Sequence, residues 1–200
     1  MKTSKVEHLK RGFSYLVCLL VLAELLLVLT SWLLSATMAE GVRSLISSEG
    51  VRWFFGSFST LLSTEWLVWL LLLAMTGGCL WQSGLLHPQD GYRQGVALRA
   101  AVVLLVIYVI AVLALTAVPH AVLLSATGQL MPSPFSRALV PIVSFGALLV
   151  SAVFGYASGR FSSVSDVVDA LSFGIGKSAP LFLLYILAVQ LYESLRFVFF

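Results

Sequence analysis

A single carboxyl side chain, Glu24, lies near the middle of residues 12–39, a run that contains no other charged residue. A carboxylate at the centre of a membrane-spanning helix costs about 2.5–3.5 kcal/mol on insertion scales, so it must pair, face a water-filled cavity or stay protonated. Such a group can exchange a proton, which is the chemistry of proton-coupled transport. Gln190 supplies a neutral hydrogen-bonding group inside another apolar segment. We therefore interpret Glu24 as a candidate proton-sensitive group and Gln190 as a candidate polar contact.

The alternative interpretation of Glu24 is structural. In that interpretation its carboxyl group bonds to Gln190, to Tyr185, to Tyr108 or to a serine or threonine hydroxyl, and so holds two helices together. Interhelical hydrogen bonds of this kind contribute about 0.6–2 kcal/mol in membranes. The sequence leaves both interpretations open.

The composition predicts an all-helical polytopic membrane protein. Hydrophobic residues make up 60% of the 200 residues and charged residues only 10%, a balance that one soluble core of this size does not accommodate. About 20 apolar residues are needed for a helix to cross the hydrocarbon core. The chain is therefore expected to form one membrane domain, residues 1–200, with five spans at residues 13–37, 66–86, 99–118, 137–158 and 179–200.

Lysine and arginine predict the orientation of these spans. The predicted topology puts eight of the twelve on the side of the N-terminus and four on the other side. The positive-inside rule then predicts a cytoplasmic N-terminus and, after five spans, an external C-terminus. The net charge of +3 indicates no nucleic-acid partner, because the basic residues flank the spans and form no continuous patch.

Two amphipathic helices are predicted between the spans. The first, at residues 49–62, has Ser48 as its cap and an apolar face at helical spacing. It is expected either to lie in the outer interface with Trp53 at headgroup depth or to pack on neighbouring protein. That face consists of Val51, Phe54, Phe55, Phe58 and Leu62.

The second amphipathic helix is predicted at residues 164–174. Gly174 and Gly176 are expected to end it, and Pro180 is expected in the first turn of the last span. Asp166 and Asp169 are three residues apart, as in a paired-carboxylate site, but we interpret them as helix-start acids on a solvated face, which are far commoner.

Small residues predict where helix backbones approach one another. Gly77 and Gly78 in the second span, with Pro141 in the fourth, are candidates for loosened or closely approached backbone near a substrate; the alternative, which we favour, is plain helix packing. The fourth span also carries a ridge at four-residue spacing that predicts a packing surface, within the chain or in a second copy. The ridge consists of Ala147, Ser151, Gly155 and Gly159.

No pattern indicates an enzyme, a metal site or a cofactor. The three histidines, at positions 8, 87 and 120, are far apart and have no carboxylate or cysteine at ligand spacing. Ser125 and the serine before Gly84 lack a base and an orienting acid. Cys18 and Cys79 are interpreted as small apolar packing residues.

Two stretches resemble the AbgT family of transporters of p-aminobenzoyl-glutamate and related aromatic antimetabolites. Residues 45–86 resemble the segment that runs from an outer helix through the second span to a Ser-Gly-Leu ending, here residues 83–85. Residues 132–190 resemble a later part of the family. The matching features there are Ser-Pro-Phe at 133–135, Gly155-Tyr156 with Gly159, Asp-Val-Val at 166–168, and Gln190.

The resemblance implies a reduced relative of these transporters. In the family a long section with a helical hairpin follows the Ser-Gly-Leu ending, whereas here only residues 87–99 follow it before the next apolar run. Trp81 and Gln82 also replace the acidic position before Ser-Gly-Leu. The implied protein lies in a bacterial inner membrane as a homodimer or with another membrane protein. It either transports a small aromatic anion or serves as a non-transporting scaffold or accessory subunit.

Overall fold

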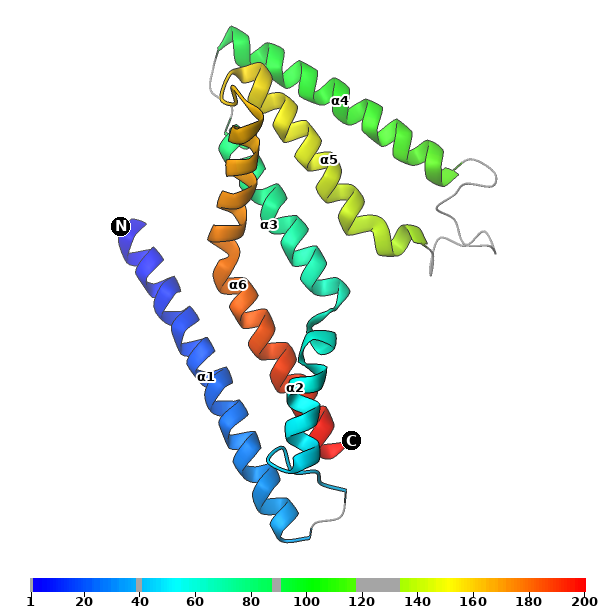
Figure 1. Ribbon diagram of the computed structural model, residues 1–200. Helices are drawn as coiled ribbons and strands as arrows, with labels where there is room; N and C mark the ends of the chain where they lie inside the picture. The colour runs from blue at the N-terminus through cyan, green and yellow to red at the C-terminus, as the bar shows by residue number, and fades with distance from the viewer. Residues whose placement is uncertain (1, 39–40, 88–90, 118–133) are drawn as a thin grey trace. The chain divides into compact units, whose positions relative to one another are not determined.

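The computed structural model describes residues 2–38, 41–87, 91–117 and 134–200 (Figure 1). His120, Ser125 and Ser133 lie outside these residues. All regular secondary structure in the described part is helical, which confirms the predicted fold class. The helices are α1 (Lys2–Ala36), α2 (Ser48–Leu62), α3 (Glu65–Ser83), α4 (Tyr92–Ala117), α5 (Pro134–Ser158) and α6 (Val164–Phe199).

Five of the helices in the described part are long and apolar enough to cross a membrane, as the sequence predicted. The candidate spans are Arg11–Ala36, Glu65–Ser83, Tyr92–Thr116, Ala138–Ser158 and Val164–Phe199. The remaining helix, α2, is the first predicted amphipathic helix. It begins one residue earlier than predicted, because Ser47 and not Ser48 is its cap: the Ser47 hydroxyl accepts a hydrogen bond from the Gly50 N–H at 3.0 Å.

The second predicted amphipathic helix is not separate, and this prediction was wrong. Residues 164–199 form one helix that passes through Gly174 and Gly176 and contains Pro180 in its interior. Neither glycine adopts the positive φ of a helix end. The carboxylate of Asp166 starts this helix by accepting hydrogen bonds from the N–H groups of Ser162 and Ser163, which agrees with its interpretation as a helix-start acid.

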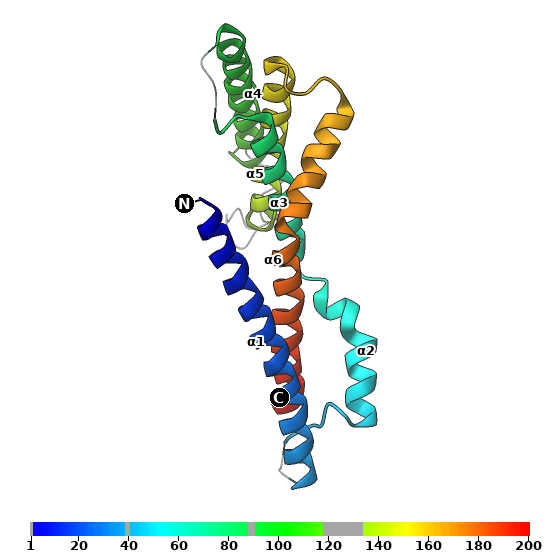
Figure 2. The ribbon, with the colours of Figure 1, turned by 90° about the vertical axis from the view of Figure 1, so that its left-hand side faces the viewer.

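The backbone divides into two compact units. The first contains Met1–Leu67 and Ala179–Phe200, and the second contains Val68–Ser178. In the first unit, α1 and α2 lie on two sides of the C-terminal part of α6 (Figure 2). Leu27, Leu45 and Val198 form its buried apolar cluster, against which Trp53 of α2 packs. Trp53 is thus half-buried on protein, whereas Phe55 of the same helix is 76% exposed.

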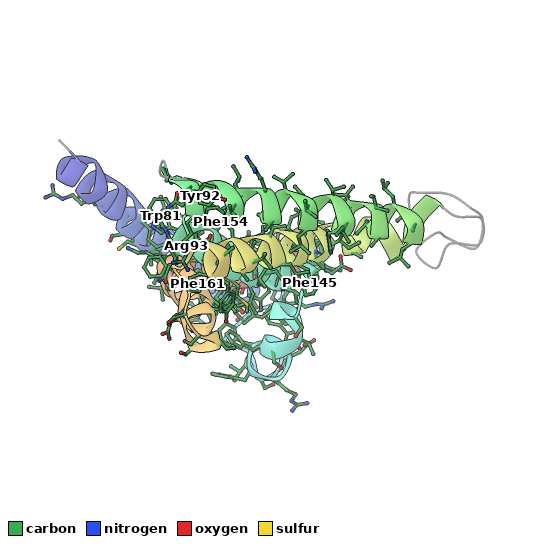
Figure 3. The ribbon with its side chains drawn as sticks, turned by 90° about the horizontal axis from the view of Figure 1, so that it is seen from above. Trp81, Tyr92, Arg93, Phe145, Phe154 and Phe161 are labelled. Atoms are coloured by element: carbon green, nitrogen blue, oxygen red, sulfur yellow. The ribbon has the colours of Figure 1, made fainter. Side chains whose placement is uncertain are left out.

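In the second unit, α4 and α5 lie side by side (Figure 1). The fully buried Phe154 fills the space between them against Ala97 and Ala101 (Figure 3). On another side of α5, Cys79 of α3, Phe161 and Ala170 of α6 form a second buried cluster.

The ridge on α5 contacts other parts of the same unit. Ser151 is fully buried and donates a hydrogen bond to the Cys79 sulfur at 3.2 Å. At Gly155 the Phe161 ring occupies the space that a side chain would need. Gly159 has φ +81° at the helix end, where the N–H groups of residues 160 and 161 both donate to the Gly155 carbonyl. Ala147 instead lines an apolar groove between α4 and α5.

Candidate functional site

Glu24 and Gln190, the two predicted polar candidates, meet at a third residue that the sequence reasoning missed. The hydroxyl of Ser194 on α6 donates a hydrogen bond to Glu24 Oε1 on α1, with an O–O distance of 2.6 Å. Gln190, one turn earlier on α6, donates from Nε2 to the Ser194 hydroxyl at 3.4 Å. Ser194 is fully buried and Gln190 is 7% exposed. The three side chains form a donor chain that runs from the amide through the hydroxyl to the carboxyl group.

Two oxygens of this cluster have no hydrogen-bond partner among the described residues. They are Glu24 Oε2 and Gln190 Oε1, both buried. A buried acceptor without a partner costs about 1–3 kcal/mol, so such groups call for a proton or a water molecule.

The other pairings considered for Glu24 are not formed. The Tyr185 hydroxyl bonds instead to the Thr64 hydroxyl and donates to the Leu62 carbonyl at 3.3 Å. The Tyr108 hydroxyl donates to the Ile142 carbonyl at 2.7 Å. Of the predicted partners, a serine hydroxyl is the one that Glu24 uses.

In the second unit, α3 and α6 approach each other at a pair of glycines. A Cβ atom placed on Gly78 would lie 2.5 Å from the Cα of Gly174, and one placed on Gly174 would lie 2.9 Å from the Cα of Gly78. Each glycine lies four residues after an alanine, Ala74 or Ala170, which is the small-xxx-small spacing of close membrane helix pairs. Gly77, in contrast, has open space at its Cβ position.

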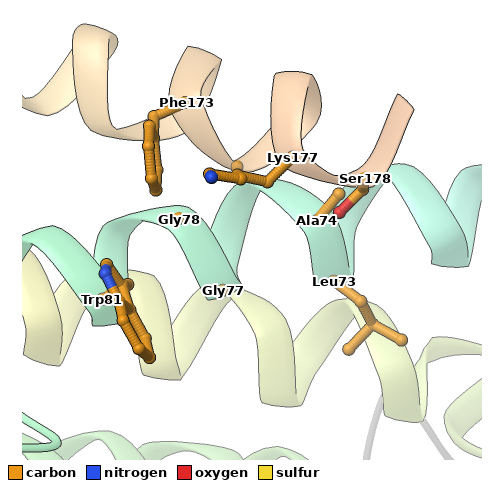
Figure 4. A pocket seen from close by; sticks show the side chains of 9 residues that line it. Leu73, Ala74, Gly77, Gly78, Trp81, Phe173, Lys177 and Ser178 are labelled. Atoms are coloured by element: carbon orange, nitrogen blue, oxygen red, sulfur yellow. The ribbon is translucent and has the colours of Figure 1, made fainter. Parts of the chain in front are cut away.

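A pocket of about 420 Å³ opens beside this glycine crossing (Figure 4). Trp81 of α3 and Phe173 of α6 supply aromatic rings, and Lys177 supplies a cation that lies 5.5 Å from the centre of the Phe173 ring. Gly77 and Gly78 lie along α3 in the same wall, where Gly78 is buried against α6 and Gly77 leaves the backbone exposed. Rings, an ammonium group and a small-residue wall together suit a flat aromatic ring that carries a negative charge.

The sequence predicted only the glycine wall of this pocket. Gly77 and Gly78 were candidates, Trp81 was treated only as a departure from a family pattern, and neither Phe173 nor Lys177 was a site candidate. The signal available was the four-residue spacing of Phe173 and Lys177 on one helical face. Pro141, the third backbone candidate, lies inside α5 and is not among the residues that line this pocket.

A model of the AbgT putative transporter family matches residues 82–197, which is more than half of the chain. The chain belongs to the AbgT family. No curated protein and no solved structure gave a match.

The AbgT match contains the α6 residues of the Glu24 cluster and of the pocket beside the glycine crossing. Gln190, Ser194 and Lys177 lie inside the matched residues, whereas Glu24 and Gly78 precede them. The later of the two resembling stretches, residues 132–190, lies wholly within the match, and residues 45–81 lie outside it. The family and the five apolar helices together make the chain a multi-pass membrane protein of transporter type.

No cluster of three or more histidine, cysteine, aspartate or glutamate side chains that could hold a metal ion occurs in the described part of this AbgT chain.

Proposed function

We propose that this AbgT-family protein transports a small aromatic acid of the p-aminobenzoyl-glutamate type across a bacterial inner membrane, with its N-terminus in the cytoplasm. The observation that carries the proposal is the pocket that Trp81, Phe173 and Lys177 line together with the exposed Gly77. The aminobenzoyl ring stacks on an aromatic side chain, and a glutamyl carboxylate pairs with the ammonium group.

Glu24 is the proposed proton-sensitive group. Its second carboxyl oxygen is buried without a partner among the described residues, and its first is held by Ser194. The charged form is costly in a membrane, so the proposal couples a change of protonation to a change in the surroundings of α1 and the C-terminal part of α6.

The test is uptake of p-aminobenzoyl-glutamate into reconstituted vesicles with an imposed pH gradient. Lys177→Gln is expected to raise the KM for uptake about tenfold by removal of a charge-assisted contact, whereas Lys177→Arg keeps the charge and stays near the wild-type KM. Glu24→Gln is expected to abolish the gradient-dependent part of uptake. Glu65→Gln, which changes an exposed carboxylate at the start of α3, serves as the matched control.

No uptake by well-folded wild-type protein would reject transport of this substrate by the chain alone. A Lys177→Gln variant with unchanged KM would reject the pocket as the substrate contact, even if transport itself is found.

A second candidate function is that of a scaffold or accessory subunit, as a homodimer or with another membrane protein. The short Ser194–Glu24 hydrogen bond favours it, because this bond joins two helices and needs no titration. Glutamine at position 24 can still accept from Ser194. Unchanged assembly together with absent uptake in both wild-type and Glu24→Gln protein would therefore support the scaffold.

A further inference from the structure

The segment between α1 and α2 folds back along α1 to the level of Ser31. Its residues 41–47 are not helical, and the Leu45 N–H donates to the Ser31 hydroxyl at 3.2 Å in a buried contact. Ser31 lies five residues before the end of the candidate span Arg11–Ala36, which is about 8 Å along a helix. The segment therefore enters the span. Non-helical backbone at this depth is found where it is buried in protein or lines a water-filled cavity.

A pocket of about 480 Å³ opens between this segment, α2 and the C-terminal end of α6. Its charged lining residues are Arg43, Glu49, Glu193 and Arg196. The α6 pair flanks Ser194 in the sequence, and Ser194 bonds to Glu24 near the middle of the α1 span. This part of the pocket thus lies deep in the span and not at headgroup level. Ionisable side chains at such depth pair with one another or face a water-filled cavity.

Pairing between the four charged side chains is incomplete. The one ion pair within the described residues joins Arg196 to Glu193 at 3.8 Å, which is long for a charge-assisted hydrogen bond. Neither Arg43 nor Glu49 takes part in an ion pair in that part of the chain. Charged groups without a partner are costly in a membrane unless they are hydrated, so the pocket must hold water. Its donors and acceptors then remain open to a solute that enters from that water.

The signs of the charges indicate which solute fits. An anion alone would face two carboxylates, and a cation alone would face two guanidinium groups. A solute with one charge of each sign meets both kinds of partner. Trp53 and Phe197 stack on each other with ring centres 4.4 Å apart, and the Arg43 guanidinium lies over the Phe197 ring at 5.7 Å. These rings therefore form no open cage for a quaternary ammonium group, and a cation with N–H donors is favoured.

We propose that this pocket is a water-filled binding site for a small zwitterion of the α-amino acid class. The carboxylate of the solute pairs with Arg43 and Arg196, and its primary ammonium group donates to Glu49 and Glu193. The volume leaves room for a side chain. The proposal does not rest on transport of an aromatic acid, because the pocket lies in the first unit and shares no residue with the Lys177 pocket.

The first experiment tests for water at this depth. Single-cysteine variants in proteoliposomes are treated with a charged, membrane-impermeant maleimide, which reacts with thiolates in water. Arg196→Cys is expected to be labelled at least about tenfold faster than Leu26→Cys, the matched control, whose side chain is exposed on α1 two residues from Glu24. Slow labelling of both variants would show a dry pocket, and fast labelling of both would place Glu24 outside the hydrocarbon core. Either result would overturn the proposal.

The second experiment compares ligands on the wild-type full chain in detergent by isothermal titration calorimetry. The probes are L-phenylalanine, 3-phenylpropanoate, which lacks the amine, and 2-phenylethylamine, which lacks the carboxylate. We expect L-phenylalanine to bind at least about tenfold more tightly than either analogue, because each analogue loses a charge-assisted contact. Equal binding of the three, or no binding of L-phenylalanine, would overturn the proposal. No variant is involved, so misfolding cannot confuse this comparison.

The third experiment asks which residues discriminate. In the double variant Glu49→Gln, Glu193→Gln we expect the preference for L-phenylalanine over 3-phenylpropanoate to disappear. In the double variant Arg43→Gln, Arg196→Gln we expect the preference over 2-phenylethylamine to disappear. Glu65→Gln changes an exposed carboxylate outside the pocket, so both preferences should persist. A double variant that is helical and monodisperse but keeps its preference would overturn the assignment of these residues.

Discussion

Ser194 and Glu24 are 170 positions apart in the sequence, yet the hydroxyl of one lies 2.6 Å from the carboxyl oxygen of the other. This contact ties α1 to the C-terminal part of α6 through polar groups inside an apolar environment. In a membrane, lipid tails compete equally well for apolar helix surfaces, so such a bond has a larger share in helix association than it would in water.

Replacement of Ser194 tests how much the Ser194–Glu24 hydrogen bond contributes to stability. Ser194→Ala leaves Glu24 Oε1 without its donor and is expected to lower the free energy of unfolding by about 1 kcal/mol. The measurement is helix loss in SDS titration followed by circular dichroism. Ser35→Ala, on the exposed side of α1, is the control and should change the midpoint little. Equal midpoints for the two variants would contradict the role given to Ser194.

The adjacent glycines 77 and 78 provide a test with its own control. Gly78→Ala places a methyl group against the backbone of α6, so the two helices must move apart, at a cost of about 1–3 kcal/mol. Gly77→Ala meets open space and is expected to be neutral or to stabilise the helix by up to about 1 kcal/mol. The same SDS titration compares them. A Gly77→Ala variant as unstable as Gly78→Ala would contradict the crossing at Gly78.

Tyr185 is predicted to secure the junction between α2 and α3. Its hydroxyl contacts the Thr64 hydroxyl and the Leu62 carbonyl, and Tyr185→Phe is expected to lower stability by about 0.5–1.5 kcal/mol. Tyr192→Phe on the same helix, whose ring is 64% exposed, should have a smaller effect. Thermal unfolding of both variants checks the difference, which would be absent if the junction were held by apolar packing alone.

The two cysteines should react with thiol reagents at different rates. Cys79 is fully buried beside Ser151, whereas Cys18 is exposed on α1. In detergent, N-ethylmaleimide is expected to modify Cys18 at least about tenfold faster, because Cys79 reacts only after the helices open. Mass spectrometry of single-cysteine variants measures both rates. Similar rates in folded protein would show that α3 and α5 separate readily.

The spans could be predicted because length and apolar composition alone decide whether a helix can cross a bilayer. In contrast, the sequence did not allow us to predict that α6 continues as one helix through Gly174 and Gly176. Where glycine ends a helix, it usually does so by adopting a positive φ. Gly174 does not, and its lack of a side chain instead allows α6 to contact α3 closely. Tertiary packing decided between two uses of the same residue, and local sequence does not contain that information.

In the polar cluster, Glu24 and Gln190 were predicted from the sequence, whereas Ser194 was not. An isolated glutamate in an apolar run is conspicuous, and so is a glutamine. A serine is common in membrane helices, so Ser194 stands out only by its four-residue spacing from Gln190. The pocket of Trp81, Phe173 and Lys177 combines residues of α3 and α6, and their proximity follows only from the fold.

The glycine crossing of α3 and α6 also has a thermodynamic consequence. Unfolding of soluble helix pairs hydrates apolar surface and so raises the heat capacity. When Gly78 and Gly174 separate inside a bilayer, their surfaces meet lipid and not water. The separation should therefore show little heat-capacity change, and the strength of this helix pair should vary with temperature far less than that of an equally small contact in a water-soluble protein.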